Sequence, residues 1–454
     1  MSEKVNKTPD LKVAIISDPH LGFIGHINPN YYGLGQQGDQ DKWWEYALRW
    51  FKNRGVDVVV VPGDMANACA YSRTDVTHTD CAVEEMARLG KIFREVFKGT
   101  DTQLFCVYGN HDALAQPLEK LNGGNQTPWE DAFGEPYSHV AYKSVKGYAF
   151  VGAHWGHEQD AKEILAREAT KTPDKPVFYV QHGELKETTC DSYKYCLNGG
   201  AGIDNVRDFD NVIALFGHTH YSITDERTIW QSSDPNAPKC TVISCSTFNY
   251  AHSKDELIRG ENLKTKHALY LTVTGKDICV ERLSFWTDEM LALANGEKTQ
   301  QIMSKCTRSA GADWRFTLGG EKVMDLKRRE ALAIAPEFPE GAIAGLARSD
   351  TFVVISFPAA IPLPFDNDIL HSYFVEAWED ETNTLVSTNQ INTEFHIDHS
   401  SKHFSEYYQI VVPNLKPNTA YTFKVYARDC FQKLSTRPII HKGKTLPSFA
   451  GRLE

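Results

Sequence analysis

The sequence of 454 residues predicts an α/β domain followed by an all-β sandwich. Five short apolar runs in the first half are rich in β-branched residues and bounded by Gly or Pro, which is typical of strands buried on both faces. Amphipathic segments with helical spacing lie between these runs. From about residue 346 the pattern changes to short alternating runs without helix signals, which is typical of a β-sandwich.

The five apolar runs share a second property, because each one ends in residues that can bind a metal. In open α/β sheets, ligands bind beyond the carboxyl ends of the strands. A single Asp or His there is usually a cap or turn residue, whereas five such endings in order indicate a site for two metal ions. The endings are Asp18 and His20 after 13–17, Asp64 after 58–62, Asn110, His111 and Asp112 after 104–108, His182 after 177–181, and His218 and His220 after 212–216.

The remaining segments complete the first domain. Apolar residues at helical spacing predict helices, and Gly55 ends the first of them. Apolar runs around tight turns predict further strands, and the last two form a hairpin that closes the domain near residue 290. We expect helices at 42–53, 81–98 and 158–170, and strands at 138–144, 147–153, 223–230, 240–246, 267–273 and 278–283.

The C-terminal part contains a less regular stretch and then the sandwich. Residues 291–345 are interpreted as a linker or accessory segment, in which 314–318 resembles a strand and 323–335 a helix. The sandwich is assigned to 346–446. Within it, 415–429 resembles the end of a fibronectin type III domain, with Tyr421 at the tyrosine-corner position. Its strands are expected at 351–357, 371–378, 407–412 and 420–427.

Composition narrows the class of protein. An apolar content of 41% and a charged content of 24% indicate an ordinary globular chain, and the net charge of −11 argues against an extended nucleic-acid or anionic-membrane surface. We find no membrane-spanning run and no visible signal peptide. The ten cysteines form no C-x-x-C pair and favour free thiols in the cytoplasm, although Cys190 and Cys196 could form a disulfide.

Residues 11 to about 250 resemble the calcineurin-like metallophosphoesterase superfamily, because the blocks D-x-H, G-D, G-N-H-D, H and G-H-x-H occur in its order. The resemblance implies a four-layer α/β/β/α sandwich and a metal-dependent phosphoric ester hydrolase. It also implies the metal ligands. One ion would be held by Asp18, His20 and His220, the other by Asn110, His182 and His218, and Asp64 would bridge the two.

The ligand types explain the chemistry that we expect. Two divalent cations roughly 3.5–4 Å apart can share a hydroxide, which attacks phosphorus in line, and can clamp the phosphoryl oxygens. Mixed nitrogen and oxygen ligands suit Mn²⁺, Fe²⁺, Zn²⁺ or Co²⁺. We expect a phosphodiesterase of the cyclic-nucleotide or general type. A phosphomonoesterase acting on a phosphoprotein or a small ester is the alternative, and a non-catalytic metal-binding scaffold is a third interpretation.

His111 is the candidate general acid, because it follows Asn110 and must face the same cleft. Asp112 is expected to support the metal ligands from behind. In many relatives the block after G-D continues to a second Asp that orients the catalytic His, whereas this chain has Asn67 there. The amide oxygen of Asn67 can accept from the imidazole but cannot stabilise imidazolium by charge. Asn67 also argues against the purple acid phosphatase branch, which carries Tyr at that position.

Further residues are candidates for contact with a phosphate-ester substrate. The loops 21–42 and 183–210 are candidate walls of the cleft. His26 lies in the first loop, and His154 and His157 follow the predicted strand at 147–153; for all three, simple packing is the alternative. Trp155 could stack on a base or a ring. The C-terminal sandwich carries no visible chemistry and is expected to serve as a packing or homo-oligomer surface, or to recruit a protein partner.

Overall fold

The computed structural model describes residues 8–22, 38–67, 78–113, 128–189, 202–251, 263–264, 266–285, 308–309, 312–361, 370–393 and 406–448. The chain divides into two compact units. One contains most of residues 1–328, and the other contains residues 329–454. None of the described helices combines the length and the apolar character needed to cross a bilayer.

The N-terminal unit contains two sheets. In its described residues the first has seven strands in the order β14-β13-β12-β1-β2-β3, with β15 paired to β13, and the second has the order β4-β5-β6-β7-β9-β8. The first sheet comprises β1 (Leu11–Ile15), β2 (Val58–Pro62), β3 (Gln103–Val107), β12 (His267–Thr274), β13 (Asp277–Ser284), β14 (Arg308–Ser309) and β15 (Trp314–Thr317); the second comprises β4 (Val140–Val145), β5 (Tyr148–Ala153), β6 (Val177–Val180), β7 (Val212–Phe216), β8 (Ile229–Trp230) and β9 (Thr241–Ser244).

The parallel pairing of the strands determines at which edge of each sheet the predicted metal ligands lie. Strands β1, β2 and β3 run parallel in one sheet, and β5, β6, β7 and β9 run parallel in the other. Because parallel strands end at the same edge of a sheet, the loops that follow them gather there. A short pair, β10 (Tyr250–Ala251) and β11 (Leu263–Lys264), lies outside the two sheets.

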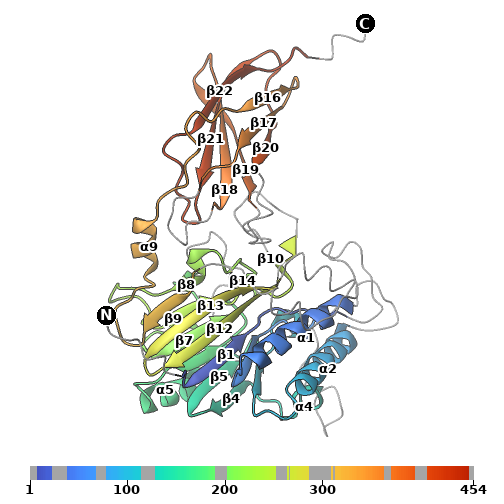
Figure 1. Cartoon of the computed structure of the whole chain (residues 1–454), viewed down its shortest axis with the longest axis vertical. Helices are drawn as coiled ribbons and strands as arrows, with labels where there is room; N and C mark the ends of the chain where they lie inside the picture. Colours follow the sequence, from blue (N-terminus) through green and yellow to red (C-terminus); the bar gives the residue numbers. More distant parts are fainter. Residues whose placement is uncertain are drawn as a thin grey trace. The chain divides into compact units, whose positions relative to one another are not determined.

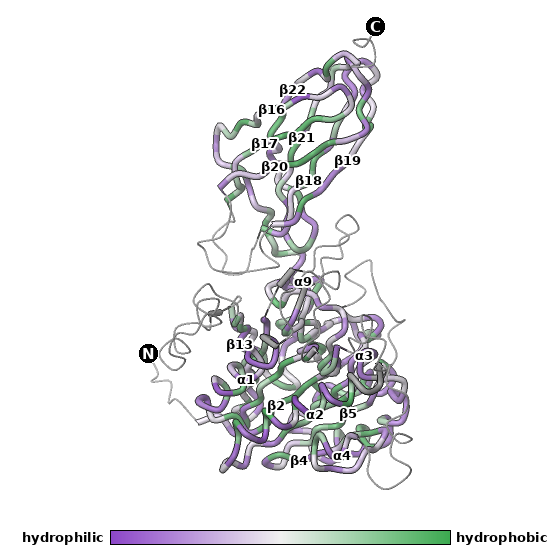
Figure 2. The backbone as a smooth tube through the Cα atoms, turned by 90° about the vertical axis from the view of Figure 1, so that its right-hand side faces the viewer, coloured by the Kyte–Doolittle hydropathy of each residue, from purple (hydrophilic) through white to green (hydrophobic). Residues whose placement is uncertain are grey.

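The helices and the two sheets of the N-terminal unit stack in four layers, with an apolar core between each pair of neighbouring layers. One core lies between the sheets and contains buried side chains of both, such as Val60 and Phe178. A second packs the first sheet against α1 and α2, and a third packs the second sheet against α5. Figure 1 shows α1 and α2 side by side along the strands, and Figure 2 shows the apolar character of β2 and β5. This is the α/β/β/α sandwich expected from the sequence.

The helices lie close to their predicted positions. In the described residues they are α1 (Gly38–Asn53), α2 (His78–Val96), α3 (Asn110–Ala113), α4 (Pro128–Phe133), α5 (Lys162–Lys171), α6 (Ile203–Val206) and α9 (Leu326–Leu332), with 3₁₀ turns at Glu158–Ala161 and Glu226–Thr228. The strand expected at 223–230 is only two residues long, Ile229–Trp230, because the three residues before it, Glu226–Thr228, adopt a 3₁₀ turn.

Strand β15 enlarges the first sheet beyond the expected hairpin. It pairs antiparallel with β13 and buries Trp314 and Phe316, while the alternate residues Arg315 and Thr317 are exposed. This segment lies in the stretch 291–345, which the sequence indicates is a linker or accessory segment. Pairing with β13 joins 314–317 to the first sheet, and the alternation of β15 places apolar side chains on its buried face.

The C-terminal unit is a sandwich of two antiparallel sheets. One sheet contains β16 (Gly345–Arg348), β17 (Val353–Pro358) and β20 (Tyr407–Val412); the other contains β18 (Ser372–Glu379), β19 (Thr384–Asn392), β21 (Ala420–Arg428) and β22 (Ile439–Lys444). The sequence pattern does not predict β16, β19 and β22, because these strands are largely exposed and bury few apolar side chains.

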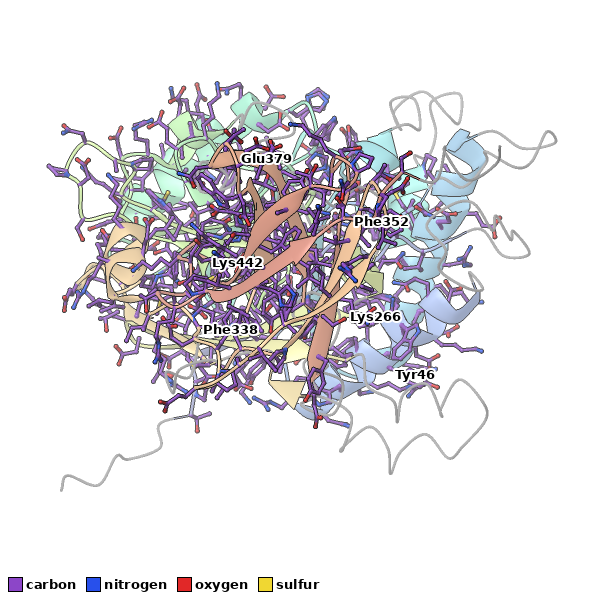
Figure 3. All side chains as sticks on the ribbon, turned by 90° about the horizontal axis from the view of Figure 1, so that it is seen from above. Tyr46, Lys266, Phe338, Phe352, Glu379 and Lys442 are labelled. Carbon is purple, nitrogen blue, oxygen red and sulfur yellow. The ribbon has the colours of Figure 1, made fainter. Side chains whose placement is uncertain are left out.

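Tyr421 forms the predicted tyrosine corner. Its side chain is buried, and its hydroxyl accepts a hydrogen bond from the backbone N–H of Lys416 at 2.9 Å. The Nζ atom of Lys416 lies 3.0 Å from both carboxylate oxygens of Glu379, which is labelled in Figure 3. These contacts join the turn before β21 to the end of β18.

Candidate metal centre

The predicted metal ligands converge at one edge of the two sheets. The loops after β1 and β2 carry Asp18, His20 and Asp64, and the loops after β6 and β7 carry His182, His218 and His220; Asn110 follows β3. Their donor atoms form two groups that share Asp64. The first sheet therefore contributes the carboxylates, and the second contributes most of the imidazoles.

The first group consists of Asp18, His20, Asp64 and His220, all buried. The Nε2 atom of His220 lies 2.8 Å from Oδ1 of Asp18 and 3.2 Å from Nε2 of His20. The Nε2 atom of His20 lies 3.7 Å from Oδ2 of Asp64. Two imidazole nitrogens and two carboxylates thus face one small volume, which is the arrangement of a divalent metal site.

The second group consists of Asp64, His182 and His218, with Asn110 beside them. The Nε2 atom of His182 lies 3.1 Å from Oδ2 of Asp64 and 3.1 Å from Oδ1 of Asn110. The rings of His182 and His218 have centroids 5.0 Å apart. The same Oδ2 atom of Asp64 therefore faces both groups, as a bridging carboxylate would.

The backbone at the ligands adopts a conformation that is rare outside glycine. Asp18, His20, Asp64, His218 and His220 have φ values between +44° and +65°. Each such residue costs about 1–3 kcal/mol unless its surroundings hold it in place, and such residues cluster at functional sites. These left-handed residues lie in the turns that follow β1, β2 and β7.

Glycines beside the ligands provide the space that the side chains occupy. A Cβ atom on Gly109 would overlap Oδ1 of Asp64 and lie 2.5 Å from Cδ2 of His182. A Cβ atom on Gly63 would lie 2.5 Å from Nδ1 of His182. Gly63 of the G-D block and Gly109 of the G-N-H-D block therefore leave room that any larger residue would take from the ligand side chains.

Hydrogen bonds behind the ligands orient them. The Nδ1–H of His182 donates to the backbone carbonyl of Pro62 at 2.7 Å, which orients the ring so that Nε2 faces Asp64. The hydroxyl of Ser17 donates to the carboxylate of Asp18. The sequence analysis did not predict a role for Ser17 or Pro62. The position of Ser17 directly before Asp18 is the one sequence signal for its contact with that carboxylate.

The charges of the cluster fit bound cations. Burial lowers the pKa of His20 well below its usual range and raises that of Asp18. Burial also lowers the pKa of His218, to about 4. At His182, by contrast, the charges of Asp64 and Asp18 outweigh burial and raise the pKa to about 10. The carboxylates thus create a negative field that attracts positive charge between them, and the neutral imidazoles nearby are available as ligands.

His111 lies at the edge of the same cluster. Its backbone N–H donates to Oδ1 of Asp64 at 2.9 Å, and its ring lies 4.8 Å from that of His20, centroid to centroid. Its Nδ1 lies 3.3 Å from the backbone carbonyl oxygen of Asn67, whereas we expected the side-chain amide of Asn67 to be the acceptor. An Nδ1–H donor there leaves Nε2 as the nitrogen that can exchange protons with a bound molecule.

Asp112 lies behind the cluster. Its buried carboxylate accepts backbone N–H groups of Met65, Ala66 and Gly109, at 3.2, 2.8 and 2.8 Å. It thereby joins the loop after β2 to the loop after β3. Burial raises the pKa of Asp112 to about 7, and the nearby Asp64 acts in the same direction.

The expected substrate residues fall in different places. His154 is buried, accepts the backbone N–H of Tyr108 at 3.0 Å and stacks on that ring, so it belongs to the core. His157 contacts Asp160 at 3.2 Å, in a separate cluster. His26, the pair Cys190 and Cys196, and most of both predicted wall loops lie outside the described residues.

Trp155 lies beside the second metal group. Its ring centroid lies 5.2 Å from that of His218 and 5.6 Å from that of His182. A Cβ atom on Gly183 would lie 3.2 Å from the Trp155 ring. The half-buried indole therefore forms one side of the ligand cluster.

Comparisons with known proteins give one family model and several similar solved structures. Residues 11–222 match the family model described as calcineurin-like phosphoesterase. No curated protein matches the sequence. Among solved structures, the chain is similar to a dimetal phosphatase from Danio rerio (12% identity, covering 68% of this chain and 100% of that one, TM-score 0.42). It is also similar to a purple acid phosphatase from yellow lupin, Lupinus luteus (14% identity, covering 61% of this chain and 52% of that one, TM-score 0.40).

The C-terminal unit has its own similar structures. One is the extracellular region of rat CD45, domains d3–d4, with 20% identity over 30% of this chain and 56% of that one, and a TM-score of 0.18.

Proposed function

We infer that this chain, whose residues 11–222 belong to the calcineurin-like phosphoesterases, hydrolyses a phosphodiester with two divalent metal ions. The observation that carries the proposal is the carboxylate of Asp64, whose Oδ2 faces both His20 and His182. A single carboxylate between two groups of imidazoles is what a pair of cations requires. When bound, the two cations supply Lewis acidity toward the phosphoryl oxygens and lower the pKa of water.

Specific residues would hold the two ions. Asp64 would be shared, because it lies in both groups, and it would offset the repulsion between the cations. The nitrogen and oxygen ligands fit Mn²⁺, Fe²⁺, Zn²⁺ or Co²⁺. The separate ligand sets are Asp18, His20 and His220 for one ion and Asn110, His182 and His218 for the other.

The protein groups would divide the remaining work. The His111 ring would donate a proton to the leaving alkoxide through Nε2, because its Nδ1 side faces the Asn67 carbonyl. The Asp64 carboxylate would hold the His111 backbone through its N–H. The Trp155 ring would exclude water beside His218 and provide an apolar surface for the leaving group.

The test is hydrolysis by metal-stripped protein reloaded with Mn²⁺. We expect cleavage of bis-p-nitrophenyl phosphate or 3′,5′-cyclic AMP to exceed cleavage of p-nitrophenyl phosphate. The test variant is Asp64→Asn, whose side chain keeps the shape of Asp64 but loses its charge. We expect this variant to lose both the second bound ion and turnover. Exclusive turnover of the monoester would replace the diesterase by a phosphomonoesterase, and full activity of Asp64→Asn would exclude the metal mechanism.

The C-terminal unit would act through binding. In the described part of the chain, every group of three or more potential metal ligands lies in the N-terminal unit. We propose that the sandwich forms a protein-binding or homo-oligomer surface. Free thiols support a reducing compartment such as the cytoplasm, and Cys106, Cys240, Cys245, Cys279 and Cys430 are free thiols.

A further inference from the structure

Two side chains of the loop after β9 donate hydrogen bonds to the backbone that carries metal ligands. The Thr247 hydroxyl donates to the carbonyl of Asp18, and the Asn249 amide donates to the carbonyl of His20, both at 3.3 Å. Thr247 is buried, and its hydroxyl oxygen also accepts the backbone N–H of Asn249 at 3.1 Å. Both acceptors are peptide groups of the first proposed ligand set, which consists of Asp18, His20 and His220.

The other two carbonyls of the same segment accept hydrogen bonds from the same region. The backbone N–H of Phe248 donates to the Ser17 carbonyl at 2.8 Å, and the buried Gln40 amide on α1 donates to the Pro19 carbonyl. The same nitrogen of Gln40 donates to the carbonyl of Phe248 at 2.9 Å. A buried carbonyl without a donor is costly, and here the four consecutive carbonyls from Ser17 to His20 are all satisfied from outside the segment.

The backbone conformation of this segment requires such partners. Asp18 and His20 have φ values of +50° and +44°, and residues in this region persist only where their surroundings over-determine them. Their backbone N–H groups donate to the carbonyls of Gly63 and Asp64, at 3.2 and 3.0 Å. The loop after β2 therefore holds the N–H groups of the segment, and the loop after β9, together with Gln40, holds its carbonyls.

The loop after β9 is in turn anchored beside His220, the third member of the first ligand set. The backbone N–H of Cys245 donates to the Phe216 carbonyl at 2.7 Å, at the end of β7. The hydroxyl oxygens of Ser244 and Thr219 lie 3.2 Å apart, and Thr219 directly precedes His220. The segment 244–249 therefore connects the D-x-H loop of the first sheet to the G-H-x-H loop of the second.

We propose that Thr247 and Asn249 are positioning residues for the first metal ion. The inference rests on the two-ion centre of the proposed function. The first ion takes ligands from both sheets, so its site forms only where the loops that carry these ligands are held at a fixed separation. The segment 244–249 contacts both loops, and the two side chains bond to the first ligand set. Their loss should therefore affect the first ion and spare the second.

General stabilisation of the fold is the competing explanation, because a buried hydroxyl that donates to a carbonyl contributes to stability wherever it lies. The two explanations differ in what they predict for the two ions. A purely structural role lowers the stability of the domain without distinguishing between them. A positioning role lowers the affinity of the first ion, by about 10–100-fold, as is typical when groups that orient the ligands are removed.

The experiment measures Mn²⁺ affinity at each site separately in the full chain. His218→Ala keeps the first ligand set complete, and His220→Ala keeps the second. Mn²⁺ is titrated by calorimetry into metal-stripped protein. In the His218→Ala background, we expect Thr247→Val and Asn249→Leu, which keep the size but remove the donors, to weaken Mn²⁺ binding about 10–100-fold. In the His220→Ala background, we expect the same changes to leave the affinity unaltered.

Two further variants separate positioning from a folding defect. Thr247→Ser keeps the hydroxyl and should restore the affinity of the first site. Thr393→Val removes a matched buried hydroxyl in the C-terminal unit, which donates to the His371 carbonyl at 3.1 Å, and should leave both affinities unaltered. Unaltered affinity of the first site in Thr247→Val, or an equal loss at both sites, would overturn the positioning role.

A second measurement needs no change to a metal ligand. The unchanged chain and Thr247→Val are equilibrated with limiting Mn²⁺, and their EPR spectra are recorded. We expect the spectrum of a spin-coupled pair from the unchanged chain and that of an isolated ion from Thr247→Val, because its first site stays empty. A coupled pair in both proteins would overturn the positioning role alone. Fewer than two bound ions in the unchanged chain at saturating Mn²⁺ would overturn the proposed function, and this inference with it.

Discussion

The carboxylate of Asp112 accepts the backbone N–H of Ala66 at 2.8 Å, across the gap between two strand ends. The same carboxylate accepts the N–H of Gly109 at 2.8 Å. Asp64 lies two residues before Ala66, and Asn110 directly follows Gly109. One buried side chain that binds no metal in the proposed ligand sets thus determines the spacing of two residues that do.

Replacing Asp112 with Ala should loosen the metal centre. Three buried N–H groups would lose their acceptor, which costs about 1–3 kcal/mol for each group left unsatisfied. Metal affinity should fall about 10–100-fold, as is typical when support behind the ligands is removed. Metal titration by calorimetry measures it. The control is Asp131→Ala, an exposed carboxylate on α4, and an equal loss of affinity there would refute the prediction.

Replacing Gly109 with Ala should displace metal ligands by steric overlap. The added methyl group meets Oδ1 of Asp64 and the His182 ring, both of them buried and unable to move freely. We expect turnover and metal content to fall at least about tenfold, because overpacking forces side chains off their rotamers. The control is Gly345→Ala on β16, where the nearest atom is 4.0 Å away. Normal metal content in Gly109→Ala would contradict the packing argument.

Stability below neutral pH should depend on His154. Burial lowers its pKa to about 3 from the usual 6.5, and His157 and His139 act in the same direction. The unfolded chain therefore binds the proton first, so stability falls as pH drops from 6.5 toward 3, by up to about 4 kcal/mol. In His154→Asn, whose side-chain oxygen can accept the Tyr108 N–H but does not titrate, the loss should be smaller. Thermal unfolding from pH 7 to 4 measures it, and parallel curves for the two proteins would refute it.

Replacing Tyr421 with Phe should destabilise only the C-terminal unit. The backbone N–H of Lys416 would lose its acceptor, at a cost of about 1–3 kcal/mol. Because the chain forms two compact units, the unfolding transition of the sandwich should shift while metal content stays unchanged. Scanning calorimetry separates the two transitions. The control is Tyr407→Phe, since Tyr407 is exposed on β20; an equal shift there would contradict the corner contact.

The sequence by itself predicted which residues gather in the candidate metal centre. The carboxyl ends of parallel strands meet at one edge of a sheet, so the apolar runs alone predict that the residues after them lie together. Asp64 and His182 illustrate this, since 118 positions separate them in the sequence and 3.1 Å separates their atoms. The strands after which they lie were evident because buried parallel strands are continuously apolar.

Tertiary structure alone decided the contacts that no periodic pattern encodes. The backbone of Asn67 rather than its amide faces His111, and β15 joins the first sheet through pairing with β13. His139 and Asp160, which the sequence did not mark, meet His157 because the β4–β5 hairpin brings the start of one strand beside the end of the other. Strand periodicity tells which face a side chain takes, whereas a contact between loops depends on the turns and on the packing of the whole domain.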